Sequence, residues 1–292
     1  MSPRKKSKSR RPKSLSHGRP QTISSSSSSL SSRATRTLIR SHHHLLKQHA
    51  AAKANDDCAR ADSIALQIER QGGLRVYQHA SLTGQSIQRG GDSSKVLMEW
   101  VDPLADDLRK AYKQGRSKLR ILEVGSLSTK NACSRSGLFE VTRIDLNPQD
   151  KDILKQDFMK RPLPLCQEER FDVLSLSLVL NYVPDPLLRG EMLRQTTRFL
   201  RDSSVEAPCA QHLPALFLVL PAPCVSNSRY LNEERLGEIM GSFGYSALRH
   251  KITPGLAYSL WKHDATAEKN SIFNKIEVRS GQSRNNFAIV LK

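Results

Sequence analysis

The sequence predicts an α/β fold built on one mostly parallel, doubly wound sheet of seven strands. From residue 118 onward, short apolar runs alternate with helical stretches, a pattern that produces parallel strands joined by right-handed crossovers. Within this region the apolar run 119–124 ends at Gly125, and the next run, 139–145, ends at Asp145. A strand that ends at a glycine, followed by a strand that ends at an acid, is typical of nucleoside-binding sheets.

Seven apolar runs are expected to be the strands of this sheet, the third of them being the weakest: 119–124, 139–145, 153–157, 171–179, 214–220, 256–262 and 286–291. Helices are expected at 129–136, 186–201 and 230–242. The last two strands are joined by a polar segment with no helical pattern, so they are predicted to finish the sheet antiparallel. This finish is typical of the class I, Rossmann-like methyltransferase fold and not of dehydrogenases, and it assigns 118–292 to one domain.

Residues 1–49 are expected to be a disordered basic arm. They contain twelve Lys or Arg, no Asp or Glu and a run of six serines, and they carry two thirds of the formal net charge of +18. Such a segment has almost nothing apolar to bury. Its basic clusters favour nuclear or nucleolar import and attraction to RNA phosphates. A solvated tail without a role and a mitochondrial transit peptide are the alternatives, although the lysine clusters and prolines argue against the latter.

Residues 50–117 are expected to form a helical extension that covers the cofactor or the substrate. Its first helix is capped by Asp56 or Asp57 and ended by Gly72-Gly73, as capping preferences predict. After a loop at 74–93, a second helix begins near Ser94, and Pro103 is expected to break or kink it.

Several classes of protein and site are disfavoured by composition. No run of 18 apolar residues occurs and no apolar segment follows the basic start, so neither a membrane-spanning helix nor a secretory signal is expected. The five cysteines are odd in number and form no CxxC pair, which argues against a zinc site or a disulfide framework. His42-His43-His44 lies within the arm, and no metal is expected there.

The turn after the first strand favours a nucleoside without phosphates. A dinucleotide site would show G-x-G-x-x-G, because a pyrophosphate needs several side-chain-free amides, but Leu127 and Ser128 occupy the later glycine positions. One glycine, Gly125, with polar Ser126, Ser128 and Thr129 suffices for a methionine-bearing nucleoside. The carboxylate of Asp145 is expected to accept hydrogen bonds from both ribose hydroxyls. An ordinary strand-to-helix turn is the alternative for Gly125.

Three further residues are candidate cofactor ligands. Glu123 lies two residues before the glycine, where its carboxylate is expected to orient the turn or meet the ligand's amino group. Asp157 follows the third strand and is placed to accept from an adenine amino group, with Phe158 against the ring face. The alternatives are that Asp157 only caps a turn and that Phe158 belongs to the core.

Polar and aromatic residues after the fourth and fifth strands are candidates for handling a base. Asn181 and Tyr182 follow the fourth strand, at the edge where ligands gather in such sheets, so we expect an amide that pairs with the base and a ring that stacks on it. After the fifth strand, Asn227, Arg229 and Tyr230 offer donors and a stacking face suited to RNA. Helix capping and packing are the alternatives at both places.

Taken together, these segments resemble the fungal family of 25S ribosomal RNA adenine-N1 methyltransferases over residues 57–292. The resemblance is carried by Leu122-Glu123-Val124-Gly125, Ile144-Asp145-Leu146-Asn147, Gln156-Asp157-Phe158, Arg161-Pro162-Leu163-Pro164, the stretches 174–184 and 218–230, and Asn286-Phe287-Ala288-Ile289-Val290-Leu291. It implies an enzyme that uses S-adenosylmethionine and acts in the nucleolus on 25S rRNA, free or within preribosomes. It also implies that Gly125 and Asp145 bind the cofactor.

Two other functions share parts of this pattern. An animal relative of the family senses S-adenosylmethionine without catalysis and reports through a protein partner, but such a sensor has no use for a basic nucleolar arm. A methyltransferase of small molecules is the third reading, and it should ignore RNA. In the favoured reading Asn181 orients the target adenine and Tyr182 stacks on it. The oligomeric state is not predicted by the sequence.

Overall fold

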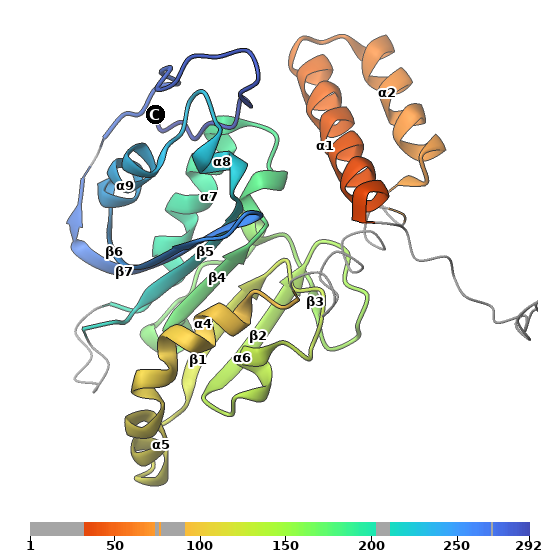
Figure 1. Ribbon diagram of the computed structural model, residues 1–292. Helices are drawn as coiled ribbons and strands as arrows, with labels where there is room; N and C mark the ends of the chain where they lie inside the picture. Colours follow the sequence, from red (N-terminus) through yellow and green to blue (C-terminus); the bar gives the residue numbers. More distant parts are fainter. Residues whose placement is uncertain (1–31, 74–75, 77–90, 203–210, 270) are drawn as a thin grey trace, which may run out of the picture.

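A seven-stranded sheet forms the centre of the molecule in the computed structural model (Figure 1), which describes residues 32–73, 76, 91–202, 211–269 and 271–292. The strand order is β3-β2-β1-β4-β5-β7-β6. The first five strands are parallel and β7 is antiparallel to both of its neighbours. The strands are β1 (Leu119–Val124), β2 (Phe139–Asp145), β3 (Leu154–Lys155), β4 (Val173–Ser177), β5 (Ala215–Pro221), β6 (Phe243–Ile252) and β7 (Leu256–Glu268). The predicted fold class is confirmed.

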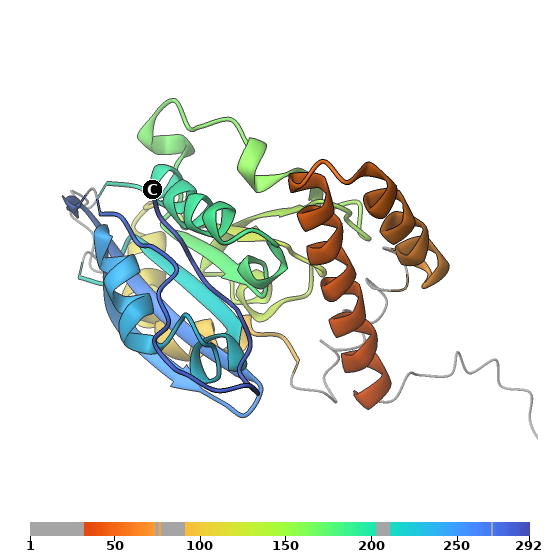
Figure 2. The same cartoon turned by 90° about the horizontal axis from the view of Figure 1, so that it is seen from above.

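Helices cover both faces of the sheet (Figures 1 and 2). One face packs against α4 (Ser94–Val101), α5 (Ala105–Lys113) and the short α6 (Ala132–Arg135). The other packs against α7 (Pro186–Phe199), α8 (Pro223–Ser226) and α9 (Glu233–Ser242). Because the central strands are buried from both sides, β5 reads as a continuous apolar run and not as an alternating one. The short 3-10 helices are η3 (Asp102–Leu104), η4 (Phe158–Lys160), η5 (Gln167–Glu169) and η6 (Leu180–Tyr182).

The antiparallel end of the sheet differs from the prediction. The outermost strand is β6, which forms a hairpin with β7, whereas the predicted strand at 286–291 is absent and makes only an isolated bridge between Phe273 and Leu291. The C-terminal segment, residues 271–292, instead packs on the helices, with Phe287, Ile289 and Leu291 buried in the core beside α7. Its run of buried side chains, 287–289, therefore reflects packing on helices. In β6 most side chains after Tyr245 are exposed or half-buried, so this edge strand shows no apolar run.

The N-terminal extension is a helical hairpin made of α1 (Ser32–Ala54) and α2 (Cys58–Arg70). The predicted disorder of residues 1–49 is therefore wrong from Ser32 onward, and the predicted boundary after residue 49 falls inside α1. Buried Leu45 and Ala52 of α1 pack on α2, and this contact stabilises a helix whose composition alone does not predict one. Residues 1–31 lie outside the described residues.

Other predictions for this region are confirmed. Asp57 caps α2 by accepting a hydrogen bond from the Arg60 N–H, and the helix ends before Gln71 and Gly72. α4 begins at Ser94, and Pro103 lies in η3, which separates α4 from α5. Most of the predicted loop at 74–93 lies outside the described residues. Among the helices that the structure describes, none is long and apolar enough to cross a membrane.

Candidate functional site

The carboxyl ends of β3, β2, β1 and β4 lie side by side and place the predicted site residues along one edge of the sheet. Val124 of β1 is in register with Ile144 of β2 on one side and with Leu176 of β4 on the other. The chain leaves β1 toward β2 and later returns to β4 on the opposite side, so this edge contains the switch point at which doubly wound sheets bind ligands.

Gly125 makes the tight turn that opens this edge. Its φ is +73°, a backbone conformation that residues with a side chain rarely adopt. A Cβ added there would lie 2.6 Å from Cγ2 of Val179. Its N–H donates to the carbonyl of Ile144 at 2.8 Å, which draws the turn against the end of β2. The structure thus requires glycine here, because both the backbone conformation and the lack of space exclude a side chain.

Asp145 ends β2 next to this turn. One carboxylate oxygen accepts from the Asn147 N–H at 2.7 Å, and no other hydrogen bond to it is seen among the described residues. Partial burial raises the pKa of the Asp145 carboxyl, while the Asn147 N–H opposes this shift. The neighbouring Leu146, which sequence reasoning passed over, is 65% exposed. An exposed leucine directly after the acid offers an apolar wall for a base, and its position in the sequence was the available signal.

Glu123 is hydrogen-bonded to residues that follow the turn after β1. Its side chain is buried, and Oε1 accepts from Asn131 Nδ2 at 3.2 Å and from Cys133 Sγ at 3.1 Å. Oε2 lies 3.8 Å from Nε of Arg143. Burial raises the pKa of Glu123, and the pKa of the Cys133 thiol rises to about 12 mainly for the same reason. This arrangement matches the predicted role in orienting the turn, while contact with the ligand's amino group stays a prediction.

Asp157 caps a turn and Phe158 belongs to the core, which were the alternatives to their predicted roles as cofactor ligands. Asp157 caps η4 through a hydrogen bond from the Met159 N–H to Oδ1, at 2.9 Å. Phe158 is buried, with its ring centroid 5.4 Å from that of Phe199. The predicted contact of Phe158 with the adenine ring is therefore not supported, because the core uses this ring. Asp157 still lies at the carboxyl edge, directly after β3.

Asn181 and Tyr182 lie in η6, at the end of β4, as predicted. The side-chain oxygen of Asn181 is buried and has no hydrogen-bond partner in the described part of the chain. A buried acceptor without a partner costs about 1–3 kcal/mol, so this oxygen is suited to a donor brought by a ligand. Leu178 just before it adopts a φ of +57°, a strained conformation for a side-chain-bearing residue that is common near functional sites.

The segment before α4 also reaches this edge, which sequence reasoning did not anticipate in detail. The hydroxyls of Ser93 and Ser177 lie 2.7 Å apart, and Ser94 Oγ accepts from the Cys133 N–H at 3.2 Å. The N–H of Ala132 donates to Asp92. Residues 92–94 are therefore bound to the turn after β1 and to the end of β4, so the start of α4 meets the site.

The loop after β5 supports the C-terminal segment. Arg229 donates to the Asn286 side chain at 2.9 Å and to the Gly281 carbonyl at 3.0 Å. Asn227 donates to the carbonyl of Ser283 at 3.4 Å, and the Tyr230 ring lies 4.3 Å from the Lys275 ammonium. These groups, which were candidates for RNA contacts, are used within the protein.

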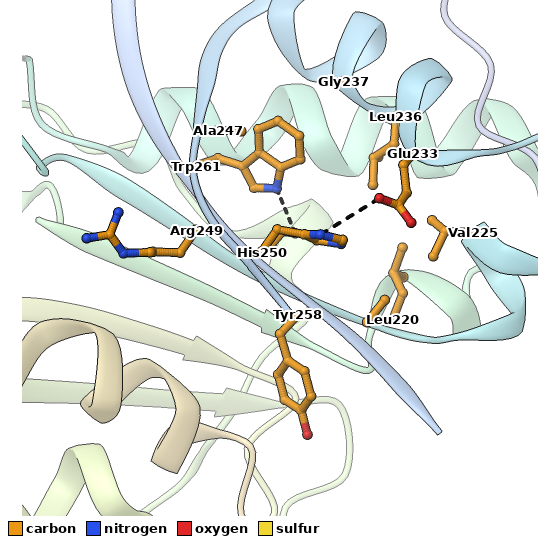
Figure 3. A pocket seen from close by; sticks show the side chains of 12 residues that line it. Leu220, Val225, Glu233, Leu236, Gly237, Ala247, Arg249, His250, Tyr258 and Trp261 are labelled. Carbon is orange, nitrogen blue, oxygen red and sulfur yellow. Dashed lines mark hydrogen bonds and ion pairs between the residues drawn. The ribbon is translucent and has the colours of Figure 1, made fainter. Parts of the chain in front are cut away.

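A pocket of about 230 Å³ lies between α9 and the β6–β7 hairpin (Figure 3). On its wall His250 Nδ1 lies 3.8 Å from Glu233 Oε2. None of the predicted site residues lines it, so this cavity is separate from the carboxyl-edge site. No group of three or more His, Cys, Asp or Glu placed to hold a metal ion occurs among the described residues.

Comparison with known families identifies the chain. The profile of the family described as "25S rRNA (adenine(2142)-N(1))-methyltransferase, Bmt2" matches residues 62–289, which is more than half of the sequence. The chain belongs to this family. The family predicted from sequence blocks is therefore confirmed, and the carboxyl-edge site is the candidate active site of a member of it.

Two relatives extend the match over most of the chain. The 25S rRNA adenine-N(1) methyltransferase of Schizosaccharomyces pombe is 38% identical over 253 residues, which cover 86% of this chain and 89% of the relative. The 25S rRNA (adenine(2142)-N(1))-methyltransferase of Saccharomyces cerevisiae is 37% identical over 255 residues, covering 85% and 70%. A solved structure, magnesium protoporphyrin IX methyltransferase from Synechocystis with bound SAM, aligns at 13% identity and a TM-score of 0.36, covering 57% of this chain and 80% of that one. Because that likeness is weak, the fold assignment rests on the strand order.

Proposed function

We propose that this protein is an enzyme that transfers a methyl group from S-adenosylmethionine to N1 of an adenine in 25S rRNA during ribosome biogenesis. The observation that carries the proposal is the family match over residues 62–289. Support comes from the carboxyl edge of the sheet, where a glycine turn, an acid and a buried amide oxygen lie at the ends of three adjacent strands.

The residues at this edge fit S-adenosylmethionine. Gly125 leaves its turn without a side chain, and Asp145 offers a carboxylate at the end of β2 for the ribose hydroxyls. Leu146 offers an apolar surface beside it. No further glycines follow that would receive a pyrophosphate. When bound, S-adenosylmethionine supplies an electrophilic methyl group on a sulfonium.

Asn181 is the residue that we assign to orienting the target base. Its buried, unpartnered oxygen is suited to accept a hydrogen bond from the exocyclic amino group of adenine, which would leave the neighbouring N1 lone pair directed at the methyl group. N1 is free once its base pair is broken, so no strong base is needed before attack, and catalysis rests on positioning and desolvation. Tyr182 is assigned to stacking on the flipped base. Forming the bond from N1 to the methyl group would break the sulfur–methyl bond, leaving neutral S-adenosylhomocysteine and moving the positive charge onto the methylated base.

Family membership favours the enzyme over a noncatalytic sensor. Both functions would use Gly125 and Asp145, but only the enzyme needs a site for a base, and Asn181 lies at the same edge as the cofactor residues. The basic N-terminal residues favour RNA as the partner. We propose a nuclear, nucleolar location on the same grounds.

Methyl transfer to full-length 25S rRNA tests the proposal. Purified protein and tritiated S-adenosylmethionine are incubated with rRNA from cells lacking the enzyme, and the modified base is mapped by reverse transcription, which N1-methyladenine blocks. We expect one methylated adenine. Asn181→Leu, which keeps the volume and removes the acceptor, should slow transfer by roughly 5- to 150-fold at saturating cofactor, as the loss of about 1–3 kcal/mol implies. Cofactor binding without any transfer by the wild type would favour the sensor.

A further inference from the structure

We propose that Arg189 is a positioning residue for the base site, and that it holds the loop carrying Asn181 and Tyr182 against the C-terminal segment. This inference rests on the proposed function. Arg189 lies in the first turn of α7 and is the largest fully buried side chain of the described residues, with 1% of its surface exposed. Burying a guanidinium is costly unless its donors are satisfied, so the identity of its partners is informative.

Within the described part of the chain, the side chain of Arg189 donates hydrogen bonds only to backbone carbonyls. Nε donates to Val183 at 2.8 Å and Nη2 to Pro184 at 3.1 Å, while Nη1 donates to Ala288 at 2.6 Å. Among the described residues no carboxylate forms an ion pair with it. Desolvation by burial lowers its pKa to about 10, and this still leaves it charged at neutral pH.

Two of these three carbonyls belong to the loop that carries the proposed base-handling residues. Val183 and Pro184 directly follow Asn181 and Tyr182, and they precede Asp185, which caps α7 by accepting from the Leu187 N–H at 2.6 Å. The planar guanidinium fork thus fixes the loop between η6 and the helix cap. A lysine ammonium lacks this fork and cannot reproduce its fixed geometry.

The third carbonyl links the loop to the far end of the chain. The guanidinium lies 4.4 Å from the centroid of the Phe287 ring and bonds the next residue. Beside it, the Val290 N–H donates to the Pro186 carbonyl at 3.0 Å. Through Arg189, the C-terminal segment therefore supports the backbone from which Asn181 projects, although it contributes no strand to the sheet.

The matched control is Arg194, one and a half turns further along α7. It also contacts the C-terminal segment, donating to the Lys292 carbonyl at 3.3 Å, and it pairs with Glu191 at 3.6 Å. None of its hydrogen bonds in the described part of the chain reaches the loop at 181–184. If Arg189→Lys slows methyl transfer only by loosening the packing of α7, Arg194→Lys should slow it similarly. If it acts by releasing the loop at 181–184, only Arg189→Lys should slow it.

The test compares Arg189→Lys with Arg194→Lys in the full chain, below the melting temperature of each variant. We expect Arg189→Lys to lower the single-turnover rate of methyl transfer at least tenfold at saturating cofactor and rRNA, with the dissociation constant for S-adenosylmethionine within twofold. Arg194→Lys should change neither by more than twofold. If Arg189→Lys does not fold, Phe287→Leu, which removes the ring beneath the guanidinium and leaves all three carbonyls, should lower the rate at least threefold.

Hydrogen exchange separates this inference from the proposed function. Amides of residues 180–183 and 185 should exchange faster in Arg189→Lys than in Arg194→Lys, whether or not the protein is active. Wild-type protein that never methylates rRNA would refute the proposed function, and exchange would then decide the positioning role. A wild-type transfer rate in folded Arg189→Lys, or equal exchange in the two variants, would overturn the inference.

Discussion

Asp145 and Glu123 lie at the same edge of the sheet, and burial raises the pKa of both carboxyl groups, but their surroundings assign them different tasks. Glu123 is almost completely enclosed and bonds side chains of the turn and of α6. Asp145 is only partly buried and accepts one backbone N–H. The enclosed carboxylate therefore supports the site, and the accessible one is suited to a ligand.

Replacement of Asp145 should weaken cofactor binding without unfolding the protein. Asp145→Ala removes the charged acceptor proposed for the ribose hydroxyls, so we expect a loss of about 1.5–3 kcal/mol in binding free energy. Titration calorimetry with S-adenosylmethionine measures it. Asp152→Ala, an exposed position on the following loop, is the control and should bind normally. Equal affinities in the two variants would remove Asp145 from the site.

Glu123 should make the stability of the protein depend on pH. A carboxyl whose pKa is raised in the folded state contributes stability that is fully present below the unfolded value, 4.5, and is lost as the pH rises through the folded value. Glu123→Gln has no such group. We therefore expect the free energy of unfolding of the variant, relative to wild type, to increase from pH 4.5 to pH 7, as measured by urea denaturation. A difference that stays constant over this range would contradict the assignment.

At the scale of elements, the contact between α7 and the C-terminal segment is close enough to exclude a single methyl group. A Cβ added to Gly190 would lie 2.1 Å from the Val290 carbonyl oxygen. The same helix carries Arg189, so this contact and the three carbonyl hydrogen bonds reinforce each other. The C-terminal segment thus takes the place beside α7 without joining the sheet.

Gly190→Ala should destabilise the protein although alanine is the better helix former. The gain in helix propensity is about 0.5–1 kcal/mol, and forcing a methyl group into a filled space costs about 1–3 kcal/mol, so a net loss of about 1–2 kcal/mol is expected. Gly237→Ala in α9 is the control, because a Cβ there meets nothing within 4 Å, and it should be neutral or stabilising. Urea denaturation measures the free energy of unfolding of both variants. A Gly190→Ala variant more stable than wild type would show that the C-terminal segment is easily displaced from α7.

At the scale of the whole molecule, we expect the basic N-terminal residues and the folded body to have separable roles. α1 begins at Ser32 and belongs to the folded part of the chain: desolvation by burial, with the charge of Arg189 in α7, lowers the pKa of Lys47. Eight of the twelve arm charges precede Ser32. A truncation that tests the arm must therefore stop before α1, or it removes part of the folded hairpin.

Deletion of residues 1–31 should weaken RNA binding and nuclear retention and leave cofactor binding intact. Each neutralised phosphate of single-stranded RNA contributes about 0.7 to the slope of log affinity against log salt, so the full chain should show a slope steeper by up to about 6. Filter binding to 25S rRNA at several salt concentrations measures it, and a fluorescent fusion reports location. Equal slopes would assign RNA binding to the body alone.

Local patterns predicted much of the fold, because they depend on neighbouring residues. The positions of β1, β2, β4 and β5, the cap of α2, the start of α4, the break at Pro103 and the placing of Gly125 and Asp145 at two strand ends follow from apolar runs, capping and turn chemistry. The family followed from blocks of residues in combination. For the same reason, local patterns predict which edge of the sheet carries the candidate site.

Contacts between distant segments decided the rest. Residues 286–291 show the apolar character of a strand, but α7 already offers them a buried surface, while β6 gains its place only by pairing with β7. Phe158 is an aromatic residue near the edge where ligands bind, yet its ring packs against Phe199 in the core. Residues 32–49 are basic, yet they fold because α2 packs against them. The sequence by itself determined which segments are apolar, capped or sharply turned. Only the tertiary structure decided which surface each segment buries, because burial is shared between residues far apart in the chain.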